Sequence, residues 1–397
     1  MPSLSRRWLI VAALFVVTLG ISTPLAAFGV FLPVIAETFG WSRGAIASAL
    51  SLNLVIGGFS GYVVGTLADR HGPRVMMLLT VALAGCAFAL VSTIGALWHL
   101  YVLVGIVGGV GMSSFYLLST STVAHWFHDR RGLAIALVLI GFNLGYMAAG
   151  PLAAWLIAQV GWRPAYAILA GGCATLTFLA AATVRLPRGS ERRAMASEAR
   201  AAATGGFTLR EALRDGRYWY LNVSWLLLGA VIFMTSVHAV PFARDRGVSL
   251  GAAALMLTAY GLGSVTGRLI AGFASDRVGV RVATSTGYVI ELAALLLLAS
   301  VPSSEMLLAA MVLFGIGAAA TDNMIVRAIP DLFGLRAIGA ISGSLSLGWR
   351  CGAALGPAAA GFLYDATGSY AGAFRTAPAV VVVSWVLFTL ATSRARA

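Results

Sequence analysis

Four ionisable side chains lie inside long apolar stretches of this sequence: Arg268, Glu291, Asp322 and Arg350. A charge at the centre of a bilayer costs at least about 2.5–3.5 kcal/mol, so such residues usually face protein or a water-filled cavity. A guanidinium suits anion binding, because it stays protonated and offers a planar fork to two carboxylate oxygens. The two arginines therefore indicate a site for a small anion.

Arg268 lies on a small and polar helix face. The other members, at spacings of three and four residues, are Gly261, Ser264, Ala271 and Ser275. Such a face lets a cavity approach the backbone and leaves the guanidinium open to water or a solute. The alternative is a structural ion pair between Arg268 and Asp322 or another acid.

Arg350 lies opposite a glycine stripe on its own helix. Gly348, Gly352 and Gly356 are spaced by four residues, a pattern suited to close helix packing. Two residues turn a helix by about 200°, so Arg350 points away from the stripe. It must face lipid or a cavity, and lipid is the costly choice.

The elements that position these residues are membrane-spanning helices. Of 397 residues, 59% are hydrophobic and only 10% charged, whereas roughly a quarter are charged in soluble proteins. Apolar runs of about 20 residues recur, the length that crosses a hydrocarbon core of ~30 Å. We predict twelve spans, at 8–33, 45–67, 75–95, 98–124, 132–159, 164–186, 218–242, 251–273, 281–301, 305–329, 337–363 and 371–392.

The net charge of +13 reflects topology rather than nucleic-acid binding, because every one of the 27 basic residues is arginine and no basic binding stretch occurs. With the N-terminus inside, 20 arginines fall in cytoplasmic segments and span ends, five in outer loops, and the remaining two inside spans. This bias satisfies the positive-inside rule and puts both termini in the cytoplasm. No metal spacing, catalytic triad or phosphate-cradling loop is found, so we expect no cofactor and no enzyme activity.

The chain contains an internal repeat. The segments 65–74 and 272–281 share the spacing G-x-x-x-D-R-x-G-x-R at an offset of 207 residues, and Gly150-Pro151 recurs as Gly356-Pro357. A long period at near-constant offset indicates a duplicated six-helix unit. We predict bundles at 1–186 and 217–397, joined by a cytoplasmic linker at 187–216.

The two loops resemble the signature of the major facilitator superfamily, and the similarity covers nearly the whole chain. Segments 28–43, 126–134 and 207–213 resemble the branch of monocarboxylate porters and oxalate/formate antiporters. The resemblance implies an all-α membrane protein of twelve transmembrane helices in two pseudo-symmetric six-helix bundles, with substrate bound at mid-membrane between the halves.

The resemblance assigns roles to the charged residues. In the family the loop motif clamps cytoplasmic helix ends, whereas the alternative for its arginines is that they only set topology. The clamp candidates are Asp69, Arg70, Arg74, Asp276, Arg277 and Arg281. Arg268 resembles an arginine that binds the substrate carboxylate in the carboxylate-porter branch. This chain departs from the mammalian members by having Ser264 in place of an aspartate and no lysine in the first span.

Further candidates for binding and coupling are polar, aromatic and ionisable residues in the spans, and the resemblance adds that the spans of Tyr116 and Asn143 line the cavity. Tyr116 and Asn143 could donate hydrogen bonds to a carboxylate and Phe28 could form an apolar wall, while Asn143 and Asn323 equally fit hydrogen bonds between helices. The candidates for proton coupling are Asp322, His238 and Glu291. A structural role is the alternative for Glu291, and a gating or packing role for His238.

We therefore predict a secondary transporter that moves a small organic anion by alternating access across the bacterial inner membrane, working as a monomer. Arg268 and Arg350 together favour a dicarboxylate, whereas neutralisation of one by Asp322 leaves a net charge of +1 for a monocarboxylate. Proton symport is the first mechanism and anion exchange the second. A drug or metabolite efflux pump is the rival with another substrate, although the first six spans hold no carboxylate that would bind a lipophilic cation.

Overall fold

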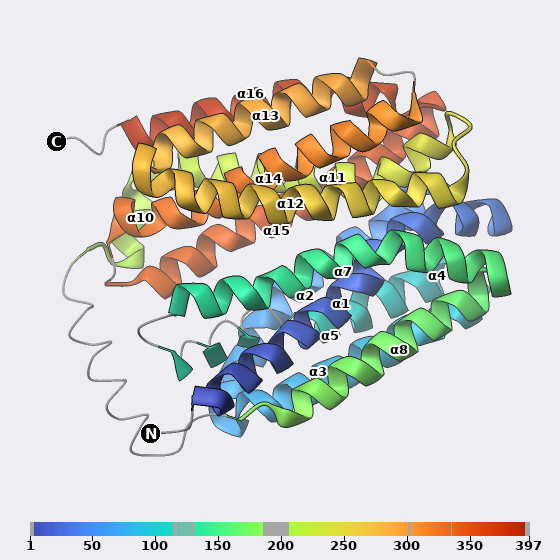
Figure 1. Cartoon of the computed structure of the whole chain (residues 1–397), viewed down its shortest axis with the longest axis horizontal. Helices are drawn as coiled ribbons and strands as arrows, with labels where there is room; N and C mark the ends of the chain where they lie inside the picture. The colour runs from blue at the N-terminus through green and yellow to red at the C-terminus, as the bar shows by residue number, and fades with distance from the viewer. Residues whose placement is uncertain are drawn as a thin grey trace. The chain divides into compact units, whose positions relative to one another are not determined.

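The computed structural model describes residues 4–113, 118–119, 122–123, 126–127, 131–185, 206–300, 303–334 and 336–393 (Figure 1). Nearly all of these residues are helical. The elements in chain order are α1 (Leu4–Phe39), α2 (Arg43–His71), α3 (Pro73–Leu90), the 3-10 turn η1 (Val91–Thr93), α4 (Leu97–Leu100), the π-helical η2 (Tyr101–Val107), α5 (Gly108–Met112), α7 (Arg131–Val160), α8 (Trp162–Thr183), α10 (Leu209–Arg214), α11 (Gly216–Arg244), α12 (Leu250–Val278), α13 (Val280–Ser300), α14 (Ser304–Phe333), α15 (Ile338–Thr367) and α16 (Ala371–Ser393).

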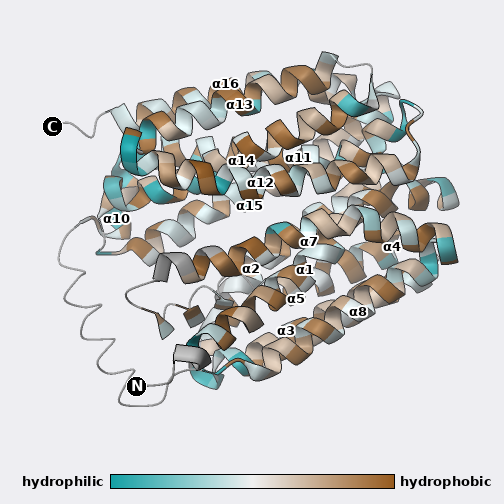
Figure 2. Cartoon of the chain, viewed as in Figure 1, coloured by the Kyte–Doolittle hydropathy of each residue, from teal (hydrophilic) through white to brown (hydrophobic). Residues whose placement is uncertain are grey.

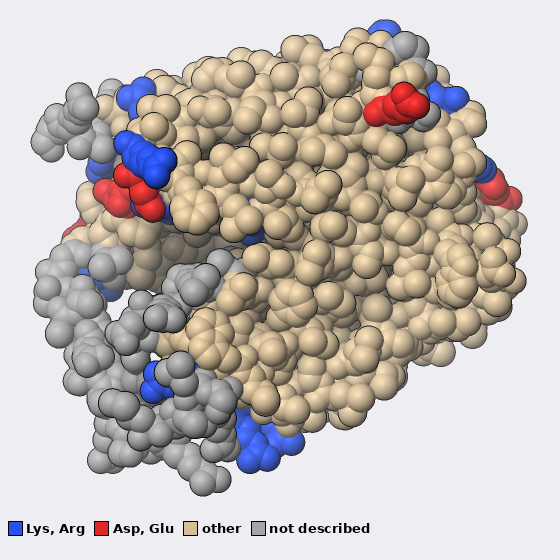
Figure 3. All heavy atoms as spheres, in the orientation of Figure 1, with Lys and Arg blue, Asp and Glu red and all other residues tan. Residues whose placement is uncertain are grey.

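Among the described residues, ten helices are long and apolar enough to cross a membrane. Hydrophobic residues dominate along the helices in Figure 2, and the charged side chains on the face in Figure 3 gather near the helix ends. Two predicted spans are not among the ten. The fourth is described as apolar helix only over Leu97–Met112, and α15 is long but rich in glycine, alanine and serine.

The internal repeat is also present in the backbone. Among the described residues, six of the seven glycines with φ between 67° and 87° form three pairs, each offset by 207 residues: Gly40 and Gly247, Gly72 and Gly279, Gly161 and Gly368. Positive φ is readily adopted by glycine but strained for other residues. Gly72 and Gly279 are the second glycines of the two loop motifs, so the motif glycine makes the sharp turn between consecutive helices.

The described chain divides into two compact units, Met1–Met195 with Ala239–Thr258, and Ala196–His238 with Ala259–Ala397. In the first unit α1 packs against α7 and α8, and α3 packs against α8. The Ala239–Thr258 segment joins this unit partly through charge, because Arg43 donates two hydrogen bonds of 2.8 Å to the carboxylate of Asp245.

In the second unit, backbone contact between helices depends on glycine. A Cβ atom on Gly348, Gly352 or Gly356 would collide with α11, at Asn222, Leu226 and Ala230 respectively. The predicted packing role of this stripe is therefore confirmed, with α11 as the partner helix. The remaining core of the unit lies where α13 packs against α14 and α16.

Candidate functional site

Arg268 on α12 and Asp322 on α14 lie side by side in the second unit. The Nη2 atom of Arg268 is 3.7 Å from Oδ2 of Asp322, and the two side chains are 28% and 20% exposed. This separation is longer than a hydrogen bond. The Nε atom of Arg268 is buried and has no hydrogen-bond partner. The acid therefore neutralises the arginine in part while leaving its donors unused.

Glycines on α12 bring these two side chains together. A Cβ atom on Gly263 would meet the carbonyl oxygen of Val312, and one on Gly267 would meet that of Ile316. The backbones of α12 and α14 are thus in direct contact, as small residues permit in membrane helices. Arg268 directly follows Gly267 in the sequence, so its side chain is attached next to this contact between the two helices.

A third side chain completes this cluster. The indole N–H of Trp225 on α11 donates a 2.9 Å hydrogen bond to Oδ1 of Asp322. Trp225 is only 7% exposed, and its ring centroid is 6.4 Å from that of Trp349 on α15. Sequence reasoning missed Trp225, because a tryptophan in an apolar span gives no sign that its N–H faces a carboxylate.

Arg350 is half-buried on α15. Within the described ranges it forms no ion pair and no hydrogen bond to another residue. Asn323, next to Asp322, is likewise half-buried and without a hydrogen bond in this part of the chain.

The other two coupling candidates are fully buried. Glu291 accepts a 3.3 Å hydrogen bond from Thr321 through one oxygen, and its second oxygen has no partner. His238 contacts the Tyr370 hydroxyl at 2.9 Å and the Pro357 carbonyl at 2.8 Å through its two ring nitrogens. Because a carbonyl only accepts, Nε2 must carry a proton and donate it there.

The first unit holds three binding candidates. Asn143 is 4% exposed, and its Nδ2 has no partner, so the amide has unused donors. Phe28 is fully buried, so none of its surface is open to a solute in this conformation. Tyr116 lies outside the described residues.

The loop motif of the second unit holds an ion pair at the end of α12. Arg327 on α14 bonds the Asp276 carboxylate at 2.6 Å and the Ser275 hydroxyl at 2.7 Å. Sequence reasoning missed Arg327 because the pair is 51 residues apart. Of the remaining clamp candidates, the four arginines form no ion pair within the described residues: Arg70, Arg277 and Arg281 are exposed and Arg74 is half-buried. The side chain of Asp69 lies outside the described part of the chain.

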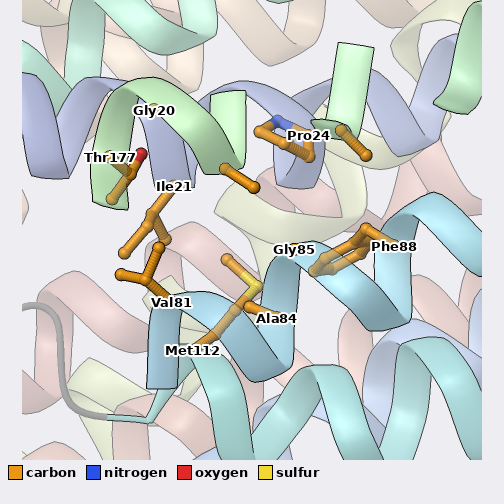
Figure 4. Close-up of a pocket in the computed structure, with 11 residues that line it drawn as sticks. Gly20, Ile21, Pro24, Val81, Ala84, Gly85, Phe88, Met112 and Thr177 are labelled. Carbon is orange, nitrogen blue, oxygen red and sulfur yellow. The ribbon is translucent and has the colours of Figure 1, made fainter. Parts of the chain in front are cut away.

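The first unit also encloses a small hollow between α1, α3, α5 and α8 (Figure 4). Its lining includes Ile21, Val81, Phe88 and Met112, and the one hydroxyl, on Thr177, donates to a backbone carbonyl of its own helix. No charged residue lines it, so this hollow is unsuited to an anion. Nor does any cluster of metal-ligating side chains occur among the described residues.

The sequence matches a protein-family model over nearly its whole length. The family model of the Major Facilitator Superfamily matches residues 10–249 and 232–397. The chain belongs to this superfamily. Its fold agrees: the solved structure of the nucleoside transporter NupG superposes with a TM-score of 0.77, covering 98% of this chain and 100% of that one at 13% identity. The predicted all-α major facilitator fold is thus confirmed, and this superfamily member is a transporter rather than an enzyme.

Two curated members come from the branch that the sequence resembles. Monocarboxylate transporter 13 of Bos taurus is 27% identical over 391 residues, covering 96% of this chain and 89% of the relative. The oxalate:formate antiporter of Oxalobacter formigenes is 26% identical over 281 residues, covering 70% and 65%. The predicted resemblance to this branch of the superfamily is confirmed.

Proposed function

We propose that this transporter carries a small monocarboxylate, of the lactate and pyruvate class, together with a proton. The observation that carries the proposal is the Arg268 guanidinium, which lies within a spanning helix, is partly exposed and donates no hydrogen bond within the described chain. A fixed cation with unused planar donors is the group that would bind a carboxylate.

The charge of the cluster favours a monoanion. Arg268 and Asp322 together carry no net charge, so Arg350 leaves these three half-buried groups with a surplus of one positive charge. The name of the bovine relative, a monocarboxylate transporter, supports the same substrate class.

Asp322 is the best candidate for coupling to protons. A substrate carboxylate that binds Arg268 would displace Asp322 from its charge partner. A proton would then bind Asp322 and neutralise its carboxylate. Substrate and proton would bind together for this reason. Glu291 and His238 are less suited, because both are fully buried.

A second function, exchange of dicarboxylates, is favoured by Arg350. A half-buried guanidinium without an anionic partner could bind the second carboxylate of a dianion. The name of the oxalate:formate antiporter fits this alternative. For either substrate we place the protein in the bacterial inner membrane as a monomer, with both termini in the cytoplasm.

Counterflow in proteoliposomes tests the proposal. Vesicles loaded with unlabelled lactate, pyruvate, oxalate or malonate are diluted into the labelled acid at pH 6 and pH 8. Monocarboxylate symport predicts lactate or pyruvate counterflow, and net uptake that is driven by an inward proton gradient. Counterflow of oxalate alone, without a response to the gradient, would favour the exchanger, and no counterflow of any acid would refute both.

A further inference from the structure

The contact between Arg268 and Asp322 is unusually loose for two opposite charges so close together. Arginine and carboxylate groups that are free to approach form hydrogen bonds of about 2.7–2.9 Å, often two in parallel. Here the closest atoms are 3.7 Å apart. The other oxygen of Asp322 accepts the 2.9 Å hydrogen bond from Trp225, which lies on a different helix, α11.

We propose that Trp225 is a positioning residue that holds Asp322 away from Arg268 and so keeps the guanidinium free for a substrate carboxylate. The inference rests on the proposed function, because it assumes that Arg268 receives the substrate. Asp322 then competes with the substrate carboxylate for Arg268, and the hydrogen bond from the indole N–H weakens this competition.

The indole is well held for this role. The Trp225 ring is 7% exposed and lies beside the Trp349 ring, which packs edge-on against Phe233 at 5.5 Å. Gly229, one turn after Trp225, allows this arrangement, since a Cβ atom there would meet the Trp349 backbone and ring. The N–H therefore has little freedom to follow Asp322 toward Arg268.

Within the described part of the chain, no cation other than Arg268 pairs with Asp322. Tyr260 on α12 and Tyr288 on α13 are phenols within electrostatic range of Asp322, and Glu291 on α13 is an acid that would repel it. Without the indole N–H, the strongest attraction left to Asp322 is Arg268. Its carboxylate should then close onto the guanidinium and form direct hydrogen bonds.

The substitution Trp225→Phe tests this, because it keeps an aromatic ring and removes the N–H. In counterflow, which needs no proton gradient, KM for lactate or oxalate should rise about tenfold, while the maximal rate changes less than twofold. The tenfold rise in KM corresponds to one additional charge-assisted hydrogen bond between Asp322 and Arg268, which the substrate must break.

Two further variants make the test specific. Trp349→Phe removes an indole N–H that has no partner, from the neighbouring ring, and should leave KM unchanged. In the double variant W225F/D322N the competitor is gone, so KM should equal that of D322N alone. Equal effects of W225F and W349F, or independent effects of W225F and D322N, would overturn the proposal.

A readout without substrate separates this inference from the proposed function. Phenylglyoxal reacts with accessible guanidinium groups, and mass spectrometry can follow the peptide that contains Arg268. Labelling of Arg268 should slow several-fold in W225F and recover in W225F/D322N. If labelling follows this pattern but no acid is transported, the proposed function is wrong and the positioning role stands. Unchanged labelling in W225F overturns the positioning role, whatever is transported.

Discussion

Replacing Arg268 by lysine tests whether this site needs a guanidinium rather than only a positive charge. Lysine keeps the charge but loses the planar fork, so a carboxylate can no longer form two parallel hydrogen bonds. The loss of one charge-assisted hydrogen bond corresponds to about 1.5–3 kcal/mol. Since 1.4 kcal/mol is a factor of about ten, KM should rise roughly 10- to 150-fold.

Asp322 adds to this effect. Its Oδ2 atom is 3.7 Å from the present guanidinium, and a flexible ammonium group could approach it more closely than the arginine does. Asp322 would then occupy the position at which the substrate carboxylate binds residue 268. At substrate concentrations near the wild-type KM, we expect transport of the carboxylate to be almost completely lost.

The assay is counterflow of lactate and oxalate over a range of concentrations, at equal protein content per vesicle. Arg375→Lys is the matched control, because Arg375 is exposed on α16 and forms no ion pair in the described structure. Thermal unfolding in detergent checks that both variants are folded. Retained transport with unchanged KM in R268K would remove Arg268 from the site.

Three further predictions concern packing, pH and the helix ends. Gly352→Leu should destabilise the protein by about 1–3 kcal/mol or more through overpacking between α15 and α11, whereas Gly343→Leu, where a Cβ meets open space, should leave the Tm nearly unchanged. The pKa of Glu211 is lowered because its carboxylate accepts a hydrogen bond from the Thr208 backbone N–H. The stability that this bond gives to α10 is therefore present above the ordinary pKa of 4.5 and lost as pH falls through the lowered value. Hydrogen exchange of α10 should show this loss in the wild type, and the pH dependence should be absent in E211Q. Asp276→Asn should change stability by less than about 1 kcal/mol, because its ion pair is exposed, and a transport rate that falls far more than the Tm would support the clamp.

Much of the fold was predictable because the bilayer imposes simple rules on sequence. Apolar length set the spans, and apart from the fourth each predicted span corresponds to one long helix. The loop motif and its offset of 207 residues recur as paired turn glycines, Gly72 and Gly279. The stripe that begins at Gly348 packs on α11, as small residues at a spacing of four indicate.

The partners of individual side chains were not predictable in the same way. Pairing of Arg268 with Asp322 was open as an alternative, but its separation depends on where α12 and α14 cross. The donor to Asp322, Trp225, lies 97 residues away on another helix. Grouping of Ala239–Thr258 with the first unit likewise depends on contacts such as that of Arg43, 202 residues from its partner. Such contacts depend on helix rotation and crossing, which spacing along one helix does not determine.

The most direct test of the central claim is a distance between a bound acid and Arg268. Solid-state NMR dipolar recoupling can measure it, with ¹³C in the carboxylate of the transported acid and ¹⁵N in the arginine side chains. We predict a ¹³C–¹⁵N distance of about 4 Å or less, as hydrogen bonding between the two groups requires, and loss of this signal in R268K while the R375K control keeps it. A bound acid whose carboxylate gives the same signal with and without Arg268 would contradict the account.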